Sequence, residues 1–149
     1  TPLYSSAASD VYKRQAKEST LRIVDYKTGG NPKIPANIEQ LFTPSETRPN
    51  YIFQTFLYAS IMCRQQTLKV APALLYIHRA ASDSYSPVIE MGEPRQPKIP
   101  VNNFTFFEDE FRKRLQTLLE EIFSENEPFT QTEDIKKCSY CDFKAICKR

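Results

Sequence analysis

The alternation of apolar and polar positions predicts four regular elements in this chain. Residues 21–30 begin with a short apolar run and end at two glycines, which is typical of a buried strand leading into a tight turn. Residues 70–78 form a second apolar run and predict another strand. Residues 51–66 and 106–123 repeat their apolar side chains at spacings of three and four, so they predict two amphipathic helices.

Each predicted helix has an apolar face that we interpret as core packing. In the first helix this face consists of Ile52, Phe56, Ala59 and Cys63. In the second helix the apolar stripe consists of Phe107, Phe111, Leu115, Leu118, Leu119 and Ile122. Its charged residues lie on the far side, and we assign this stripe no chemistry.

The segments between these elements are rich in proline. Residues 31–50 contain four prolines and are predicted to form a polar loop without regular structure. Residues 82–100 are predicted to form a connector with at most a short strand at 88–90.

The start of the chain differs from the rest in composition. Residues 1–15 are rich in Ser and Ala and show neither a capped helix nor an alternating strand, so we expect a non-native or disordered leader there. We therefore predict a core over residues 16–137 and a cysteine-rich tail over residues 138–149, with the N-terminal part of the core incomplete.

Length and composition fit one globular domain. The chain has 149 residues, of which 40% are hydrophobic and 26% are charged. No apolar run approaches the length that crosses a bilayer, so we expect no membrane span. The formal net charge of +2 is too small to indicate a nucleic-acid partner by itself, and the basic residues near the C-terminus are typical of a solvated end.

The cysteines point to a metal site. Cys138, Cys141 and Cys147 lie within ten residues of one another, and without a signal peptide such spacing favours a metal over disulfides. Zinc and an iron–sulfur cluster both remain open, and we expect a reducing cytoplasm. Cys63 follows Gln54 by nine positions, which turns it to nearly the opposite side of the helix, so we interpret it as a packing residue.

Two pairs of polar residues stand out in the predicted elements. Asp25 and Lys27 project from the same face of the first strand, where they either pair with each other or hold a metal. Gln54 and Tyr58 are four positions apart and share one face of the first helix. His78 is the single histidine, and we interpret it as a packed or surface residue rather than a ligand.

The residues in these positions resemble one family. Ile-Val-Asp-Tyr-Lys-Thr-Gly, at 23–29, resembles the central motif of the PD-(D/E)XK nucleases in the branch of the RecB and AddB nuclease domains. Gln54 and Tyr58 match the Gln-x-x-x-Tyr motif of that branch. The three C-terminal cysteines resemble the end of its four-cysteine [4Fe–4S] staple, whose first cysteine has no counterpart here.

The resemblance implies a fold and a site. It implies an α/β fold with a central mixed β-sheet flanked by helices, like the core of restriction endonucleases. Asp25 and the backbone carbonyl of Tyr26 would bind Mg²⁺ or Mn²⁺, and Lys27 would orient or activate the attacking water. Gln54 would support the metal site or contact DNA, and Tyr58 would position the strand that is cut.

The resemblance also implies a biological role. We expect a DNA exonuclease of double-strand-break repair that is fused or bound to a helicase. The alternatives are a stand-alone iron–sulfur exonuclease of CRISPR adaptation and a non-catalytic DNA-binding remnant stapled by zinc or a cluster. The family's upstream acidic ligand would fall near Asp10, which lacks the expected neighbours, so we expect these residues alone to be inactive.

Overall fold

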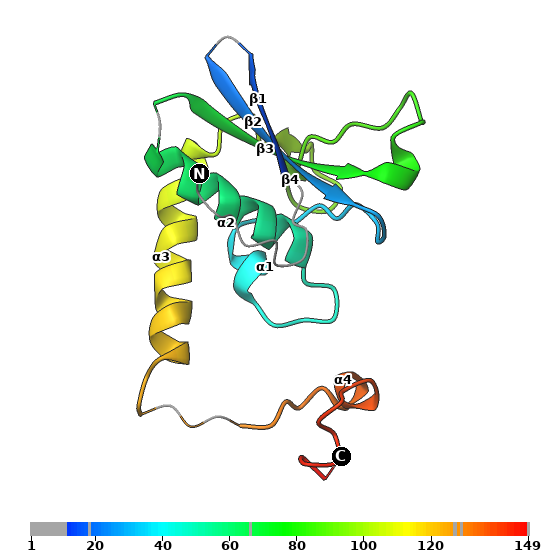
Figure 1. Ribbon diagram of the computed structural model, residues 1–149, viewed down its shortest axis with the longest axis vertical. Helices are drawn as coiled ribbons and strands as arrows, with labels where there is room; N and C mark the ends of the chain where they lie inside the picture. Colours follow the sequence, from blue (N-terminus) through cyan, green and yellow to red (C-terminus); the bar gives the residue numbers. More distant parts are fainter. Residues whose placement is uncertain (1–11, 18, 66, 127, 129, 149) are drawn as a thin grey trace, which may run out of the picture. The chain divides into compact units, whose positions relative to one another are not determined.

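The computed structural model describes residues 12–148 apart from 18, 66, 127 and 129 (Figure 1). The chain divides into two compact units between Leu118 and Leu119. This division comes earlier than the predicted boundary at residue 137. Within the described residues, no helix is both long and apolar enough to cross a membrane.

A three-stranded mixed sheet forms the centre of the first unit. Its strands are β1 (Tyr12–Lys17), β2 (Thr20–Lys27) and β3 (Lys69–Tyr76), in the order β1-β2-β3. β1 pairs with β2 in antiparallel fashion, whereas β2 pairs with β3 in parallel. A parallel pair needs a crossover connection, and the chain between β2 and β3 provides one that contains α2 (Asn50–Gln65).

The start of the described chain forms a strand that the sequence pattern did not indicate. Residues 12–15 belong to β1, where Tyr12 pairs in register with Asp25. Their polar composition hid the strand because β1 is an edge strand, and such strands need no continuous apolar run. Residues 1–11, including Asp10, lie outside the described residues.

Shorter elements complete the first unit. The loop predicted over residues 31–50 contains a helix, α1 (Glu39–Phe42), which the buried Leu41 anchors in the core. β3 is followed by the 3-10 turn η1 (Ile77–Arg79). The connector after it holds the strand pair β4 (Glu90–Met91) and β5 (Ile99–Pro100).

The core lies between the sheet and the helices α2 and α3 (Thr105–Ile122). α2 packs against β2 and β3, as Figure 1 shows, and buried residues of all three elements belong to one core cluster. Its buried Phe56 contacts the rings of Phe104 and Phe111 at centroid distances of 4.9 and 6.0 Å. Each fully buried side chain of this size contributes about 1.5–3 kcal/mol to the stability of the fold.

The predicted apolar stripe of α3 packs only in its first half. Phe111 is fully buried, and Phe107 and Leu115 are partly buried against the core. Leu119 and Ile122 are 44% and 46% exposed, so the prediction of core packing is wrong for them.

Among its described residues, the second unit contains the last turn of α3 and the short helix α4 (Ile135–Ser139), which is followed by a series of turns. Several large apolar side chains in it are exposed, including Tyr140 and Ile146. Cys138, Cys141 and Cys147 are each half-buried.

Candidate active site at the carboxyl ends of β2 and β3

Asp25 is a charged residue in an apolar face of the sheet. Side chains alternate along β2, so Asp25 follows Leu21 and Ile23 onto the face that α2 covers. Its side chain is 1% exposed. A carboxylate in such a position costs free energy unless cations or hydrogen-bond donors surround it.

Two side chains stabilise this carboxylate at its Oδ2 atom. The Lys27 Nζ atom lies 3.0 Å from Asp25 Oδ2, and the Thr55 Oγ1 atom lies 3.3 Å from the same oxygen. Thr55 Oγ1 also lies 2.8 Å from the carbonyl oxygen of Tyr51. A hydroxyl has one proton to donate, so Thr55 divides it between these two acceptors.

Lys27 connects the strand to α2. Its ammonium donates a hydrogen bond of 2.7 Å to Gln54 Oε1, and Gln54 Nε2 donates one of 2.9 Å to the Tyr58 hydroxyl. The structure therefore brings together the four side chains that the sequence proposed: Asp25, Lys27, Gln54 and Tyr58. They form one continuous chain of polar contacts from strand to helix.

Tyr51 completes the surroundings of Lys27, and the sequence reasoning missed it. The Lys27 ammonium lies 4.6 Å from the centroid of the Tyr51 ring, within range of a cation–π contact. Gly30 approaches this ring so closely that a Cβ atom there would lie 2.9 Å from Tyr51 Cε2. The φ angle of Gly30 is 82°, a conformation that favours glycine.

Helical periodicity contained a signal for the two missed residues. Tyr51 and Thr55 precede Gln54 and Tyr58 by three positions each, so all four lie on one face of α2. The sequence analysis used only the spacing between Gln54 and Tyr58. A search of the whole helix face beside Gln54 would have included both Tyr51 and Thr55.

Tyr76 ends β3 beside this site. It pairs in register with Lys27 and is 2% exposed. Burial, together with the neighbouring Tyr85, Tyr51 and Asp25, raises the pKa of Tyr76 to about 12. The phenol is therefore neutral at physiological pH and can donate its proton in a hydrogen bond.

Comparison with models of protein families shows which superfamily contains this chain. The model of the PD-(D/E)XK nuclease superfamily matches residues 10–148, almost the whole chain. The chain belongs to the PD-(D/E)XK nuclease superfamily. Among curated proteins and among solved structures, none matches the chain.

The mixed α/β architecture fits the restriction-endonuclease-like fold of this superfamily, as the sequence predicted. Members are metal-dependent nucleases that typically use Mg²⁺ or Mn²⁺. Asp25-Tyr26-Lys27 has the (D/E)-x-K pattern of the superfamily's name. The carboxylate of Asp25 and the ammonium of Lys27 form an ion pair here.

The ligand atoms that this PD-(D/E)XK site offers are oxygens, which suit a hard cation. The carboxylate of Asp25 and the backbone carbonyl of Tyr26 are oxygen ligands, which Mg²⁺ and Mn²⁺ prefer. A carboxylate accepts at about four lone-pair positions, so it can accept hydrogen bonds and bind a cation at the same time. Within the described residues, no group of three or more His, Cys, Asp and Glu side chains is placed to hold a metal.

The three tail cysteines are therefore not brought together as a ligand set in this structure. Local backbone hydrogen bonds organise their segment: Cys141 N donates to Cys138 O at 3.1 Å, and Cys147 N donates to Phe143 O at 3.2 Å. These turns hold the cysteines in one short stretch of chain. Thiolates are suitable ligands for zinc and for an iron–sulfur cluster, but these three are not arranged around a common centre in this structure.

Cys63 and His78 lie where packing and surface residues are expected. Cys63 is partly buried against the core. Burial, and then the nearby Glu108, raises the pKa of the Cys63 thiol to about 11, which makes it unreactive at neutral pH. His78 lies in η1, at the surface, with its ring 6.1 Å from that of Tyr76.

Proposed function

We propose that this domain hydrolyses phosphodiester bonds of DNA with Mg²⁺ or Mn²⁺ as cofactor. The observation that carries the proposal is the contact chain from Asp25 through Lys27 and Gln54 to Tyr58. A salt bridge needed only for stability would not require an amide and a phenol to continue it. Membership of the PD-(D/E)XK nuclease superfamily supports the same activity.

In this mechanism Asp25 and the backbone carbonyl of Tyr26 would hold the cation. When bound, the metal stabilises negative charge on the phosphate and lowers the pKa of a coordinated water. Lys27 holds the attacking water. An ammonium has three N–H groups, of which one faces Asp25 and one binds Gln54, so the third is available for that water.

Gln54 and Tyr58 fix the orientation of the Lys27 ammonium. The amide oxygen of Gln54 fixes the direction of the ammonium, and the hydrogen bond from Gln54 Nε2 to Tyr58 fixes the amide. The Tyr58 hydroxyl lies at the end of this chain of contacts, where it would position the strand that is cut. Tyr51 packs over the ammonium and restricts it further.

Within the superfamily, we assign the domain to the RecB/AddB type, an exonuclease of double-strand-break repair that works with a helicase in the cytoplasm. The Gln-x-x-x-Tyr spacing of Gln54 and Tyr58 and the three tail cysteines support this assignment. A stand-alone exonuclease of CRISPR adaptation is the alternative with the same motifs. The tail would bind a [4Fe–4S] cluster through Cys138, Cys141 and Cys147, with zinc as the alternative metal.

The activity is tested with linear DNA and Mg²⁺ or Mn²⁺, on the complete protein and its variants D25N and D109N. Asp109 is a matched control because its side chain is 98% exposed on α3. We expect D25N to slow cleavage by roughly 100-fold or more, the scale of losing one transition-state contact, and D109N to cleave normally. Undiminished cleavage by D25N contradicts the proposal, and DNA binding without metal-dependent cleavage by the wild type indicates the non-catalytic remnant instead.

A further inference from the structure

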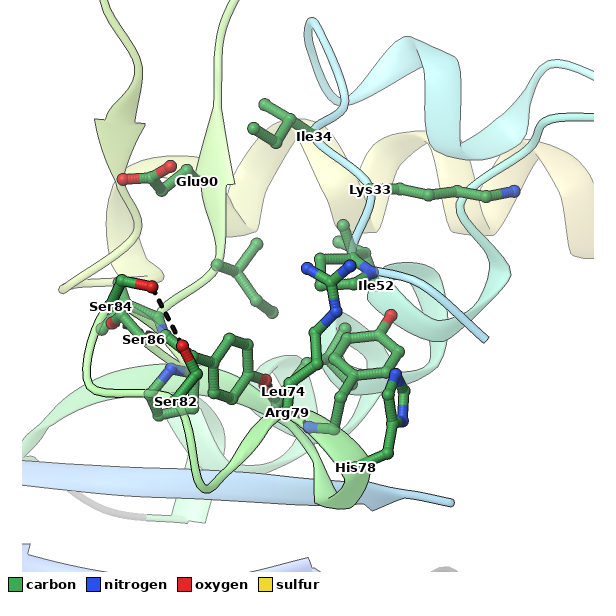
Figure 2. A pocket seen from close by; sticks show the side chains of 16 residues that line it. Lys33, Ile34, Ile52, Leu74, His78, Arg79, Ser82, Ser84, Ser86 and Glu90 are labelled. Atoms are coloured by element: carbon green, nitrogen blue, oxygen red, sulfur yellow. Dashed lines mark hydrogen bonds between the residues drawn. The ribbon is translucent and has the colours of Figure 1, made fainter. Parts of the chain in front are cut away.

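A cavity of about 450 Å³ opens beyond the carboxyl end of β3, and the mechanism above does not use it. Figure 2 shows its lining, which comes from β3, from η1 and the serine-rich turn after it, and from the loop around Lys33. This volume is in the range of small-molecule sites and is sufficient for one nucleotide.

The cavity carries positive charge. Its lining contains two cationic side chains, Lys33 and Arg79, against a single acid, Glu90. In Figure 2 the Arg79 side chain extends from η1 into the hollow, while Glu90 lies on the other side of it. In the part of the chain that the structure describes, no carboxylate forms an ion pair with Arg79.

An exposed guanidinium facing a cavity is a recognition element for phosphate. Its N–H groups match two phosphate oxygens at once, which gives short, charge-assisted hydrogen bonds. The ammonium of Lys33 binds the carbonyl oxygens of Thr47 and Arg48 at 2.9 and 3.2 Å, and Figure 2 shows it directed away from the hollow, so Arg79 is the cation that faces the cavity. The Ser82 and Ser84 hydroxyls, 3.0 Å apart, supply neutral polar groups at the rim.

The rest of the cavity wall is apolar and rigid. Ile52, Leu74 and the ring of Tyr85 line it. Tyr85 is held by two hydrogen bonds: its hydroxyl accepts from Tyr76 N at 2.8 Å and donates to Leu74 O at 2.7 Å. A ring fixed in this way offers a flat face on which a base or sugar can pack.

The cavity lies next to the candidate active site. Tyr76 lines it and lies opposite Lys27 in the register of β2 and β3. A second hollow of about 280 Å³ shares Lys33, Ile52 and Tyr76 with it and reaches Gly30 and Tyr51, which surround Lys27. Parallel strands end at one edge of a sheet, so the scissile bond and a neighbouring nucleotide would lie along that edge.

We propose that this cavity is a nucleotide subsite, which binds a nucleoside monophosphate unit of the DNA strand next to the bond that is cut. Arg79 and His78 bind its phosphate, and the wall that contains Tyr85 packs against its sugar and base. The inference rests on the proposed nuclease function. Binding to the subsite itself needs neither the metal nor Asp25.

His78 makes a direct test possible because it is the single histidine of the chain. Its two imidazole C–H resonances can be followed by NMR during titration of the 149-residue protein with thymidine 5′-monophosphate, with EDTA present. We expect a saturable shift of both resonances. Thymidine without phosphate and inorganic phosphate should each bind at least about tenfold more weakly, since each lacks half of the contacts.

R79Q should weaken binding of thymidine 5′-monophosphate by about tenfold, since it removes a charged hydrogen-bond donor. R64Q is the matched control, because Arg64 is exposed in the last turn of α2, about 15 Å along the helix from Gln54. D25N should bind as the wild type does, which separates this test from the test of catalysis. The proposal fails if His78 shows no saturable shift, if R79Q and R64Q bind equally, or if inorganic phosphate binds as tightly as the nucleotide.

Discussion

The Lys27 ammonium donates a 2.7 Å hydrogen bond to the side-chain oxygen of Gln54, a residue 27 positions later in the chain. This bond joins the end of β2 to the first half of α2. Lys27 also forms its ion pair with Asp25, so its position is fixed from the strand and from the helix together. A side chain held from two elements is suited to place a water molecule or a phosphate oxygen.

Replacing Lys27 by Met should lower the free energy of unfolding by about 2–4 kcal/mol. The buried Asp25 would lose its main partner, and an uncompensated buried charge is costly. K113M, at an exposed site of α3, should change the free energy of unfolding by less than about 0.5 kcal/mol. Urea unfolding measures both, and the double variant D25N/K27M should recover part of the loss. Equal stability of K27M and K113M would show that the ion pair contributes nothing.

Gly30→Ala should destabilise the protein by about 1–2 kcal/mol. Its positive φ angle is strained for alanine, and the new Cβ atom would lie 2.9 Å from the Tyr51 ring. Gly29→Ala is the matched control, since no atom lies within 4 Å of the Cβ position there. Thermal unfolding of the two variants compares them directly. If G29A loses as much stability as G30A, the contact between Gly30 and Tyr51 is not the cause.

Stability should fall at high pH in a way that depends on Tyr76. Its pKa is raised from 10.0 to about 12 in the folded protein, so the folded state holds the phenol proton more tightly than the unfolded state. This contribution is complete below pH 10 and is lost as the pH rises towards 12. In urea unfolding across this pH range, the free energy of unfolding should fall less steeply with pH for Y76F than for the wild type. An identical dependence of the unfolding free energy on pH in the two proteins would contradict the raised pKa.

The purified protein should contain a thiolate-bound metal in the tail. Metal analysis of the wild type, C141S and C63S should find iron or zinc in the wild type and in C63S, and its loss in C141S. C141S should also be less stable, since a structural metal contributes to folding free energy. C63S should lose only about 1 kcal/mol, from a hydroxyl placed in partly apolar surroundings. Loss of metal from C63S would make Cys63 a ligand.

Periodicity predicted the elements that build the site. The strand of Asp25, the helix of Gln54 and the second long helix all lie within a residue or two of their predicted positions. These elements bury continuous apolar faces, and burial leaves a pattern in the sequence. The resemblance correctly indicated the PD-(D/E)XK nuclease superfamily and the mixed sheet.

The features that sequence reasoning missed depend on tertiary context. β1 is polar and forms because β2 offers it an edge to pair with, and α1 forms in a proline-rich loop because Leu41 reaches the core. Tyr51 and Lys27 are in contact only because of the way α2 packs across β2, which the sequence pattern does not specify. The spacing of the tail cysteines could not show whether their thiols meet.

The most direct test of the central claim is a titration of the 149-residue protein with Mn²⁺, followed by electron paramagnetic resonance in the presence of a short DNA duplex. If Asp25 is the metal ligand, the wild type and D109N should bind one Mn²⁺ each, and D25N should bind it at least about tenfold more weakly. Equal binding of Mn²⁺ by D25N and D109N would contradict the assignment of Asp25 as the ligand of a nuclease metal.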